Sequence, residues 1–325
     1  MSKTFCSAVA AVALLAMAGA AQAADWQPDK PIRLVVPFGP GGATDVVARV
    51  LASNLSTTLG QPVVVENRAG AGALIGTSAV KESKPDGYTL LVTTIGFGAN
   101  PALYREKKLP FDPLKDFTYV TQIVNVPTIF VVHPSLNIKS PKEFLERAKE
   151  KPGTLSMGSA GYGTINHLAA ELVKAETGIN TIHVPYRSGG LSVAAAVSGE
   201  ISGIFATTPT SLGHIKNNAL VPLATSGVGK VSALPDLPPL SATIPGFDVV
   251  EWQGIVGPAG MPKNIVDTLH AKFTAALKDP AIVKRLDELG AEPVGSSPAE
   301  FEAFVKAEVK KWFTVADRTG MKAEN

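Results

Sequence analysis

The chain has 325 residues, of which 30 are basic and 28 acidic, with a formal net charge of +2. This near balance argues against nucleic acid or an anionic membrane as a partner. The single cysteine, Cys6, lies in the N-terminal segment, so disulfides, thiolate metal sites and a cysteine nucleophile are excluded from the rest of the chain. The length suggests two domains whose cores need no covalent staple.

The N-terminal segment has the three parts of a secretory signal peptide. Lys3 supplies a positive charge, residues 8–20 form an apolar region too short to span a bilayer, and Ala21-Gln22-Ala23 is an A-x-A cleavage site. Residues 1–23 are therefore predicted to be removed, which leaves Ala24 as the first mature residue. Export without disulfides indicates a bacterial periplasm.

Short β-branched runs alternate with segments of helical period along the chain, which is typical of an α/β fold. The first strand is predicted at Ile32–Val36, and it enters the glycine-rich loop Phe38–Thr44. A helix follows over Asp45–Leu59, and further strands are predicted from Val63 and from Tyr88 to Thr93. The loop therefore presents the N-terminus of a helix.

The same pattern returns about 120 residues later, a spacing visible in the sequence. A short run ending at Met157 enters a second glycine-rich loop, residues 158–164, and a helix is predicted over Ile165–Glu176 before a strand over Thr181–Val184. A helix N-terminus offers unpaired N–H groups and a partial positive charge, so each loop is a candidate anion site. Two such units predict two similar lobes around a cleft.

The β-rich segments Phe117–Val132, interrupted at Pro127, and Val249–Val256 are predicted to connect the lobes. On this interpretation residues 24–124 and 248–325 form the first lobe and residues 125–247 the second. Two connecting segments make a hinge, and closure around a ligand is a known switching mode of such proteins.

Several ordered motifs resemble those of the Bug family, the periplasmic solute receptors associated with tripartite tricarboxylate transporters. The motifs are Pro31–Phe38 with Pro40–Asp45, Val65–Gly72, Pro85–Leu90, Gly158–Gly161 with Gly163-Thr164 and His167-Leu168-Ala169, Val184-Pro185-Tyr186, and Gly257–Gly260. The resemblance implies a two-lobed Venus-flytrap of the type II periplasmic-binding class. It also implies a monomer without cofactor that binds a small carboxylated solute and delivers it to the membrane components of a transporter.

The family holds a ligand carboxylate mainly with loop N–H groups, hydroxyls and water, and neither loop here contains Lys or Arg. The candidate ligand-binding residues are Phe38, Gly42, Ala43, Thr44, Asp45, Gly70, Gly72, Thr94, Ser159, Ala160, Gly161, Gly163, Thr164, His167, Tyr186 and Thr207. Structural roles stay open for some of them: Asp45 also suits a helix dipole, His167 a buried structural position, and Phe38 and Tyr186 core packing.

Other functions are weaker interpretations. Met157–Gly161 lacks the first glycine of a nucleophile elbow, so a hydrolase using Ser159 is an alternative without a visible base. Gly39-x-Gly41-x-x-Thr44 lacks the third glycine of a dinucleotide fingerprint. The histidines have no metal-binding spacing, and no catalytic residue is expected. A sensor receptor on the same fold also stays open, as does the identity of the carboxylated ligand, which for the family includes di- and tricarboxylates, acidic amino acids and aromatic acids.

Overall fold

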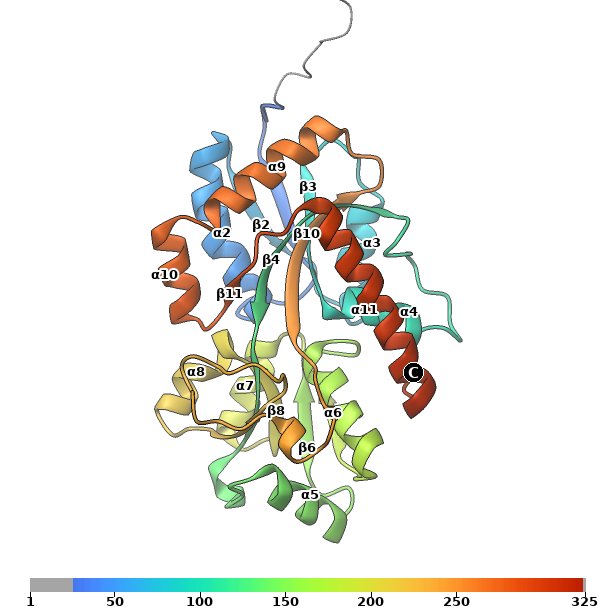
Figure 1. The fold of residues 1–325 in the computed structure, drawn as a ribbon, viewed down its shortest axis with the longest axis vertical. Helices are drawn as coiled ribbons and strands as arrows, with labels where there is room; N and C mark the ends of the chain where they lie inside the picture. Colours follow the sequence, from blue (N-terminus) through green and yellow to red (C-terminus); the bar gives the residue numbers. More distant parts are fainter. Residues whose placement is uncertain (1–25, 324–325) are drawn as a thin grey trace, which may run out of the picture.

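The computed structural model describes residues 26–323, so the predicted signal peptide, residues 1–23, lies outside the described part. The described chain folds into two lobes, each built around one β-sheet with helices on its faces (Figure 1). The fold is thus the α/β, two-lobed architecture expected from the alternating pattern. We call the part around the larger sheet lobe 1 and the part around the smaller sheet lobe 2.

Lobe 1 has a six-stranded sheet in the order β11-β4-β10-β3-β1-β2. Its strands are β1 (Ile32–Val36), β2 (Val63–Asn67), β3 (Thr89–Thr94), β4 (Phe117–Val126), β10 (Glu251–Pro258) and β11 (Glu292–Pro293). Its helices are α2 (Ala43–Leu59), α3 (Leu74–Lys81), α4 (Ile95–Leu103), α9 (Lys263–Ala276), α10 (Pro280–Glu288) and α11 (Pro298–Thr319). Strands β1 to β3 run parallel, whereas β10 is antiparallel to both β3 and β4.

Lobe 2 has a five-stranded sheet in the order β7-β6-β8-β5-β9. Its strands are β5 (Thr128–Val132), β6 (Ser156–Ser159), β7 (Ile182–Pro185), β8 (Gly203–Thr207) and β9 (Val221–Thr225). Its helices are α5 (Pro141–Glu150), α6 (Ile165–Thr177), α7 (Gly189–Ser198) and α8 (Thr208–Lys216), with two short 3₁₀ turns, Pro134–Leu136 and Leu240–Ala242. Apart from the edge strand β11, the two sheets have the same order, since β2-β1-β3-β10-β4 matches β7-β6-β8-β5-β9.

Local sequence explains why the two glycine loops open helices. In α2 the apolar stripe formed by Val47, Leu51 and Leu55 is fully buried against the sheet. The helix ends at Gly60, and its counterpart α6 ends at Gly178, both with φ near 69°. A residue with a side chain adopts this left-handed conformation only with strain, so glycine at these positions fixes where each helix stops.

Two segments connect the lobes, and they lie side by side in the middle of the molecule (Figure 1). Strand β4 passes through Pro127 into β5 of the other sheet, and the chain returns to lobe 1 as β10. The two crossing strands β4 and β10 pair antiparallel from Glu251 opposite Val126 to Pro258 opposite Phe117. The residue boundaries of the two domains stay a prediction.

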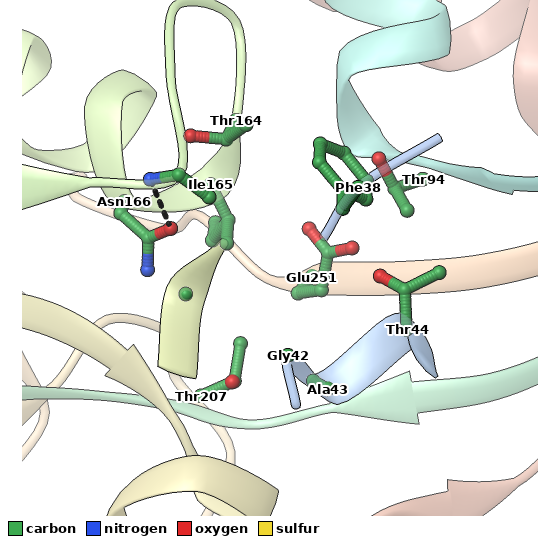
Figure 2. Close-up of a pocket in the computed structure, with 12 residues that line it drawn as sticks. Phe38, Gly42, Ala43, Thr44, Thr94, Thr164, Ile165, Asn166, Thr207 and Glu251 are labelled. Carbon is green, nitrogen blue, oxygen red and sulfur yellow. Dashed lines mark hydrogen bonds between the residues drawn. The ribbon is translucent and has the colours of Figure 1, made fainter. Parts of the chain in front are cut away.

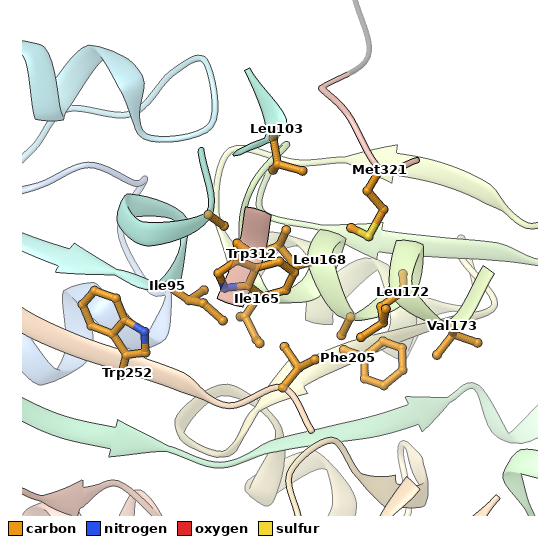
Figure 3. Packing of buried hydrophobic residues seen from close by; sticks show 14 of the residues in the cluster. Ile95, Leu103, Ile165, Leu168, Leu172, Val173, Phe205, Trp252, Trp312 and Met321 are labelled. Carbon is orange, nitrogen blue, oxygen red and sulfur yellow. The ribbon is translucent and has the colours of Figure 1, made fainter. Parts of the chain in front are cut away.

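The largest apolar cluster runs across the boundary between the lobes. Ile165 and Leu168 of α6 belong to the same buried cluster as Trp312 of α11 and Ile95 of α4 (Figure 3). Two smaller clusters fill the remaining faces, one in each lobe. The lobes are therefore packed against each other in this arrangement.

No helix within residues 26–323 is both long and apolar enough to cross a membrane.

Candidate functional site

A small cavity lies between the lobes where helix N-termini from both meet (Figure 2). Its volume is ≈ 40 Å³. Lobe 1 contributes the starts of α2 and α4, and lobe 2 contributes the starts of α6, α7 and α8. The lining residues are Phe38, Gly42, Ala43, Thr44, Thr94, Ala160, Thr164, Ile165, Asn166, Gly189, Thr207 and Glu251.

Four of these five helices begin without a side-chain cap. The N-cap residues Gly42 of α2, Thr94 of α4, Thr164 of α6 and Thr207 of α8 make no capping hydrogen bond in the described chain. Only α7 is capped in the usual way, because Ser188 accepts a hydrogen bond from the Leu191 N–H. The first N–H of α4 is used by Glu251 and that of α8 by the Pro127 carbonyl oxygen. The positive ends of the four helices still face the cavity and favour an anion there.

Of the helices that begin away from the cavity, α3 and α9 also lack a side-chain cap, whereas three others are capped. Ser140 caps α5, Asp279 caps α10, and Ser297 forms a full capping box with Glu300 at α11. A side-chain cap occupies the first-turn N–H groups and is normally favourable by about 1 kcal/mol. An uncapped start is therefore common among the helices at the cavity, but it is not confined to them.

Glu251 is the one ionisable residue among the cavity's lining residues, and it is 4% exposed. The backbone N–H of Ile95 bonds to its carboxyl group, while no group in residues 26–323 bonds to Oε2. Burial raises the pKa of Glu251 well above its usual value, and the nearby Glu308 carboxyl raises it further. These surroundings therefore disfavour the ionised form of the carboxyl group at the cavity wall.

Gln253 lies two residues further along β10, on the same face of the strand as Glu251. It is opposite Thr94 in the register and fully buried. Neither atom of its side-chain amide has a hydrogen-bond partner in the described chain. Each buried polar group without a partner costs about 1–3 kcal/mol. Gln253 is not among the residues that line either cavity.

Backbone contacts between glycines close the cavity. The Gly39 N–H of lobe 1 donates to the Arg187 carbonyl oxygen of lobe 2 at 3.0 Å. A Cβ on Gly190 would lie 2.5 Å from the Gly41 carbonyl oxygen, and one on Gly96 would lie 2.6 Å from that of Gly163. Because only glycine permits these approaches, the sequence itself sets how tightly the two lobes can meet.

A larger cavity of ≈ 800 Å³ adjoins the small one, and Phe38 and Ala160 line both. It lies between the loop around Gly70 and Gly72 of lobe 1 and the segment around Tyr186 of lobe 2. The smaller cavity holds only a few water molecules. A solute of several carbon atoms therefore needs the lobes to separate and the boundary formed by Phe38 and Ala160 to move.

The structure distributes the sequence-predicted site residues over three places. The small cavity is lined by Phe38, Gly42, Ala43, Thr44, Thr94, Ala160, Thr164 and Thr207. Four others line the larger cavity: Gly70, Gly72, Gly161 and Tyr186. The remaining four line neither, namely Asp45, Ser159, Gly163 and His167.

Asp45 holds the glycine loop of lobe 1 in shape. Its carboxylate accepts hydrogen bonds from the Gly41 N–H at 3.0 Å, from Asn67 at 2.9 Å and from the Arg49 guanidinium. Burial alone raises the pKa of Asp45, but the bonds from Arg49, Gly41 and Asn67 outweigh it, and the pKa is lowered. Asp45 is therefore an ionised brace beneath the loop.

Ser159 and His183 form a close pair, with 2.6 Å between Oγ and Nε2. A serine beside a histidine is the arrangement that the hydrolase alternative requires. Ser159 is, however, fully buried, and its Oγ also accepts the Gly161 N–H at 2.9 Å. The pair shapes the loop of lobe 2 and does not meet a substrate in this arrangement.

His167 braces the same loop from the other side, since its Nδ1 accepts the Gly163 N–H at 3.3 Å. Tyr162 packs its ring edge-on against the rings of His167 and His183. Burial lowers the pKa of His167 to about 3, with further contributions from His183 and Lys174. His167 is therefore a neutral hydrogen-bond acceptor.

The outer residues have structural partners too. Tyr186 donates its hydroxyl to Glu200 at 2.7 Å, which is the partner that a partly buried tyrosine requires. Arg68 forms an ion pair with Glu66. Arg187, by contrast, lines the larger cavity.

Sequence reasoning missed four lining residues, Ile165, Asn166, Gly189 and Glu251. Asn166 joins the lobe 2 loop to the sheet, because its Oδ1 accepts the Ala160 N–H at 3.3 Å (Figure 2) and its Nδ2 donates to the Phe205 carbonyl oxygen. The available signal for Glu251 was a single acid inside an otherwise apolar β-rich segment. No group of three or more potential ligand residues suited to a metal ion occurs in the described part of the chain.

Two lobes of this topology around a cavity ringed by helix N-termini define a solute-binding protein of the type II periplasmic-binding class. The chain belongs to the receptor family of the tripartite tricarboxylate transporters, since the model described as "Tripartite tricarboxylate transporter family receptor" matches residues 47–321. This confirms the resemblance seen in the motifs. The family consists of periplasmic binding proteins and not of enzymes, so the hydrolase alternative falls.

Three solved structures show the same fold at high similarity. The periplasmic binding protein BugD is 32% identical with a TM-score of 0.87, covering 91% of this chain and 100% of that one. Rpa4515 from R. palustris, solved with adipate, is 34% identical with a TM-score of 0.86, covering 91% and 99%. MatC from Rhodopseudomonas palustris, solved with malate, is 30% identical with a TM-score of 0.85, covering 89% and 99%.

Proposed function

We propose that this protein binds a small dicarboxylate in the cavity between its lobes. The observation that supports the proposal most directly is the set of four uncapped helix N-termini around a cavity lined by no Lys, Arg or His among the described residues. Such a site binds an anion through N–H groups and hydroxyls. Two related proteins, Rpa4515 and MatC, were solved with the dicarboxylates adipate and malate.

Both lobes contribute helix N-termini to the binding of one ligand carboxylate. One carboxylate lies between the starts of α2 and α4 in lobe 1 and those of α6 and α8 in lobe 2, so both lobes hold the same ligand. The rest of the solute extends past Phe38 and Ala160 toward the larger cavity. Closure on the ligand then brings the glycine contacts together.

The remaining parts of the proposal follow from the family. The protein is exported by residues 1–23, acts in the periplasm as a monomer, and delivers its solute to the membrane components of a tripartite tricarboxylate transporter. The family description names this transporter class.

A thermal-shift screen with ligand-stripped protein tests the proposal. Adipate, malate, succinate and citrate are compared, with dimethyl adipate as the matched control that has the same chain but no charge. A ligand at about 100 times its dissociation constant stabilises by roughly 2.7 kcal/mol, which for a chain of this size raises the melting temperature by about 4 °C. If no acid produces a shift, or if the uncharged diester shifts the temperature equally, the proposal is wrong.

A further inference from the structure

The wall of the cavity holds a polar atom whose hydrogen bond is unmet. Glu251 opens strand β10, where the chain has just re-entered lobe 1, and it is 4% exposed. One side of its carboxyl group meets the Ile95 N–H at the start of α4. Within the described residues, Oε2 has no hydrogen-bond partner although it is buried. Because Glu251 lines the small cavity, a ligand bound there lies next to this carboxyl group.

The surroundings of Glu251 disfavour a negative charge on it. The second acid nearby is Glu308 of α11, which is held by the Nε1–H groups of Trp252 and Trp312 at 3.2 and 3.3 Å. Lys311 lies 3.4 Å from the other oxygen of Glu308, so the cation in this group is paired with Glu308 and not with Glu251. Two features favour the protonated form of Glu251: an acid is its neighbour, and none of the described residues that line the cavity is basic.

A protonated carboxyl group changes what the cavity can bind. Its O–H is a donor, and a hydrogen bond from O–H to a carboxylate oxygen is short and strong, at about 2.5–2.7 Å. A buried carboxylic acid kept neutral so that it can donate in this way is known from enzyme oxyanion sites. An ionised Glu251 would instead repel the same ligand.

We propose that Glu251 is a specificity-determining residue, which donates the hydrogen of its Oε2 to a carboxylate oxygen of the bound solute. The site then favours a dicarboxylate over the α-amino acid of the same length. An ammonium group would lie among the positive ends of uncapped helices, where it is disfavoured. This inference rests on the proposed function, and it adds a selection rule to it.

Matched pairs of acids and two variants of Glu251 test the rule. Calorimetry is carried out with succinate against L-aspartate and glutarate against L-glutamate, because the members of each pair differ only in the amino group. We expect wild-type protein to bind each dicarboxylate about tenfold or more tighter than its amino counterpart, because the ammonium group would lie among the positive ends of the helices.

The variants separate a donor from a charge. Glu251→Gln keeps a donor of similar shape without an ionisable proton, and it should bind dicarboxylates within about threefold of wild type. Glu251→Met keeps the volume without a donor, and it should weaken binding by about tenfold or more. Exposed Glu288, which pairs with Arg285, gives the control Glu288→Gln, and unfolding of each variant without ligand shows that it is folded.

The outcomes distinguish the two proposals. If wild-type protein binds none of the acids, the proposed function itself fails. If it binds dicarboxylates but Glu251→Met binds them equally well, only the role of Glu251 is wrong. If amino acids bind more tightly and Glu251→Gln loses them by more than tenfold, Glu251 is ionised and pairs with an ammonium group, which overturns the inference.

Discussion

The two lobes have the same strand order but place different polar side chains opposite the N-cap threonines that line the cavity. In both sheets the fourth position is taken by the strand that follows a crossing, β10 in lobe 1 and β5 in lobe 2. Opposite the N-cap threonines, Thr94 and Thr207, lobe 1 places Gln253 and lobe 2 places Thr128. Within residues 26–323 the Gln253 side-chain amide has no hydrogen-bond partner, whereas the Thr128 hydroxyl bonds to the Val126 carbonyl oxygen. The two lobes thus share their strand topology, and they differ in the polar residue at equivalent positions of β10 and β5.

The glycine loops differ in the same way. In each lobe a buried side chain accepts an N–H from the loop: Asp45 accepts from Gly41, and Ser159 accepts from Gly161. The brace of lobe 1 is a charged carboxylate, and that of lobe 2 is a hydroxyl supported by histidines. Side chains of the protein itself therefore hold both loops in shape. The carboxylate of Asp45 does so in lobe 1, and the hydroxyl of Ser159 in lobe 2.

The largest loss of stability is expected when Asp45, the charged brace of lobe 1, is removed. Asp45→Ala leaves the Gly41 N–H and the Asn67 amide without their acceptor and removes the partner of Arg49. We expect a loss of about 3 kcal/mol in the free energy of unfolding, measured by urea denaturation. Asp267→Ala is the control, because its pair with Lys263 is exposed and should contribute less than about 1 kcal/mol. Equal effects at both positions would contradict the bracing role.

The second prediction compares the lobes by their response to acid pH, which acts on His167 of lobe 2. Because the pKa of His167 is lowered to about 3, the folded protein keeps it neutral while the unfolded chain takes up a proton below pH ~6.5. Stability is therefore complete above that pH and falls as the pH drops toward 3, by about 2 kcal/mol between pH 7 and 5. His167→Gln should remove this part of the loss in unfolding experiments at the two pH values. An unchanged pH dependence in the variant would exclude His167 as its source.

The third prediction concerns the seam where the lobes meet. Gly190→Ala places a Cβ against the Gly41 carbonyl oxygen, so closure is impeded and the affinity for adipate should fall about tenfold. Gly213→Ala in α8 meets no atom within 4 Å and serves as the control. Calorimetry measures both. Unchanged binding by Gly190→Ala would show that the ligand-bound form does not use this contact.

The smallest effect is expected when Ser159, the neutral brace of lobe 2, is removed. Ser159→Ala removes an acceptor of the Gly161 N–H and the partner of His183. We expect a loss of about 1 kcal/mol in the free energy of unfolding, about a third of the Asp45→Ala effect. Urea denaturation of the two variants side by side measures the ratio. A larger loss for Ser159→Ala would reverse the comparison.

Features set by local sequence were predictable. The two strand–loop–helix units were predicted from the spacing of the apolar residues and from the glycines that end each helix. Their helices begin and end within two residues of the predicted positions. The structure and its solved neighbours confirm the fold that the family motifs implied. At Ser140 only half of a capping box forms, because the Glu143 carboxylate accepts from the Lys139 N–H and not from the Ser140 N–H.

Features set by packing between distant segments were not predictable. Glu251 lines the cavity only because β10 pairs with β4 and starts at the seam, and sequence period does not give that register. Asp45, Ser159 and His167 look like ligand contacts in sequence, yet they bond to their own loops. The ligand-binding list, the signal peptide and the domain limits stay predictions.

The sharing of one carboxylate by two indole rings has a practical consequence. Trp252 and Trp312 both donate to Glu308, and Trp312 also belongs to the apolar cluster that includes Ile165 and Leu168 of the opposite lobe (Figure 3). The chain has three tryptophans, and two of them therefore sit where the lobes meet. Intrinsic fluorescence should report opening and closing directly, so solute capture can be timed in the unlabelled protein.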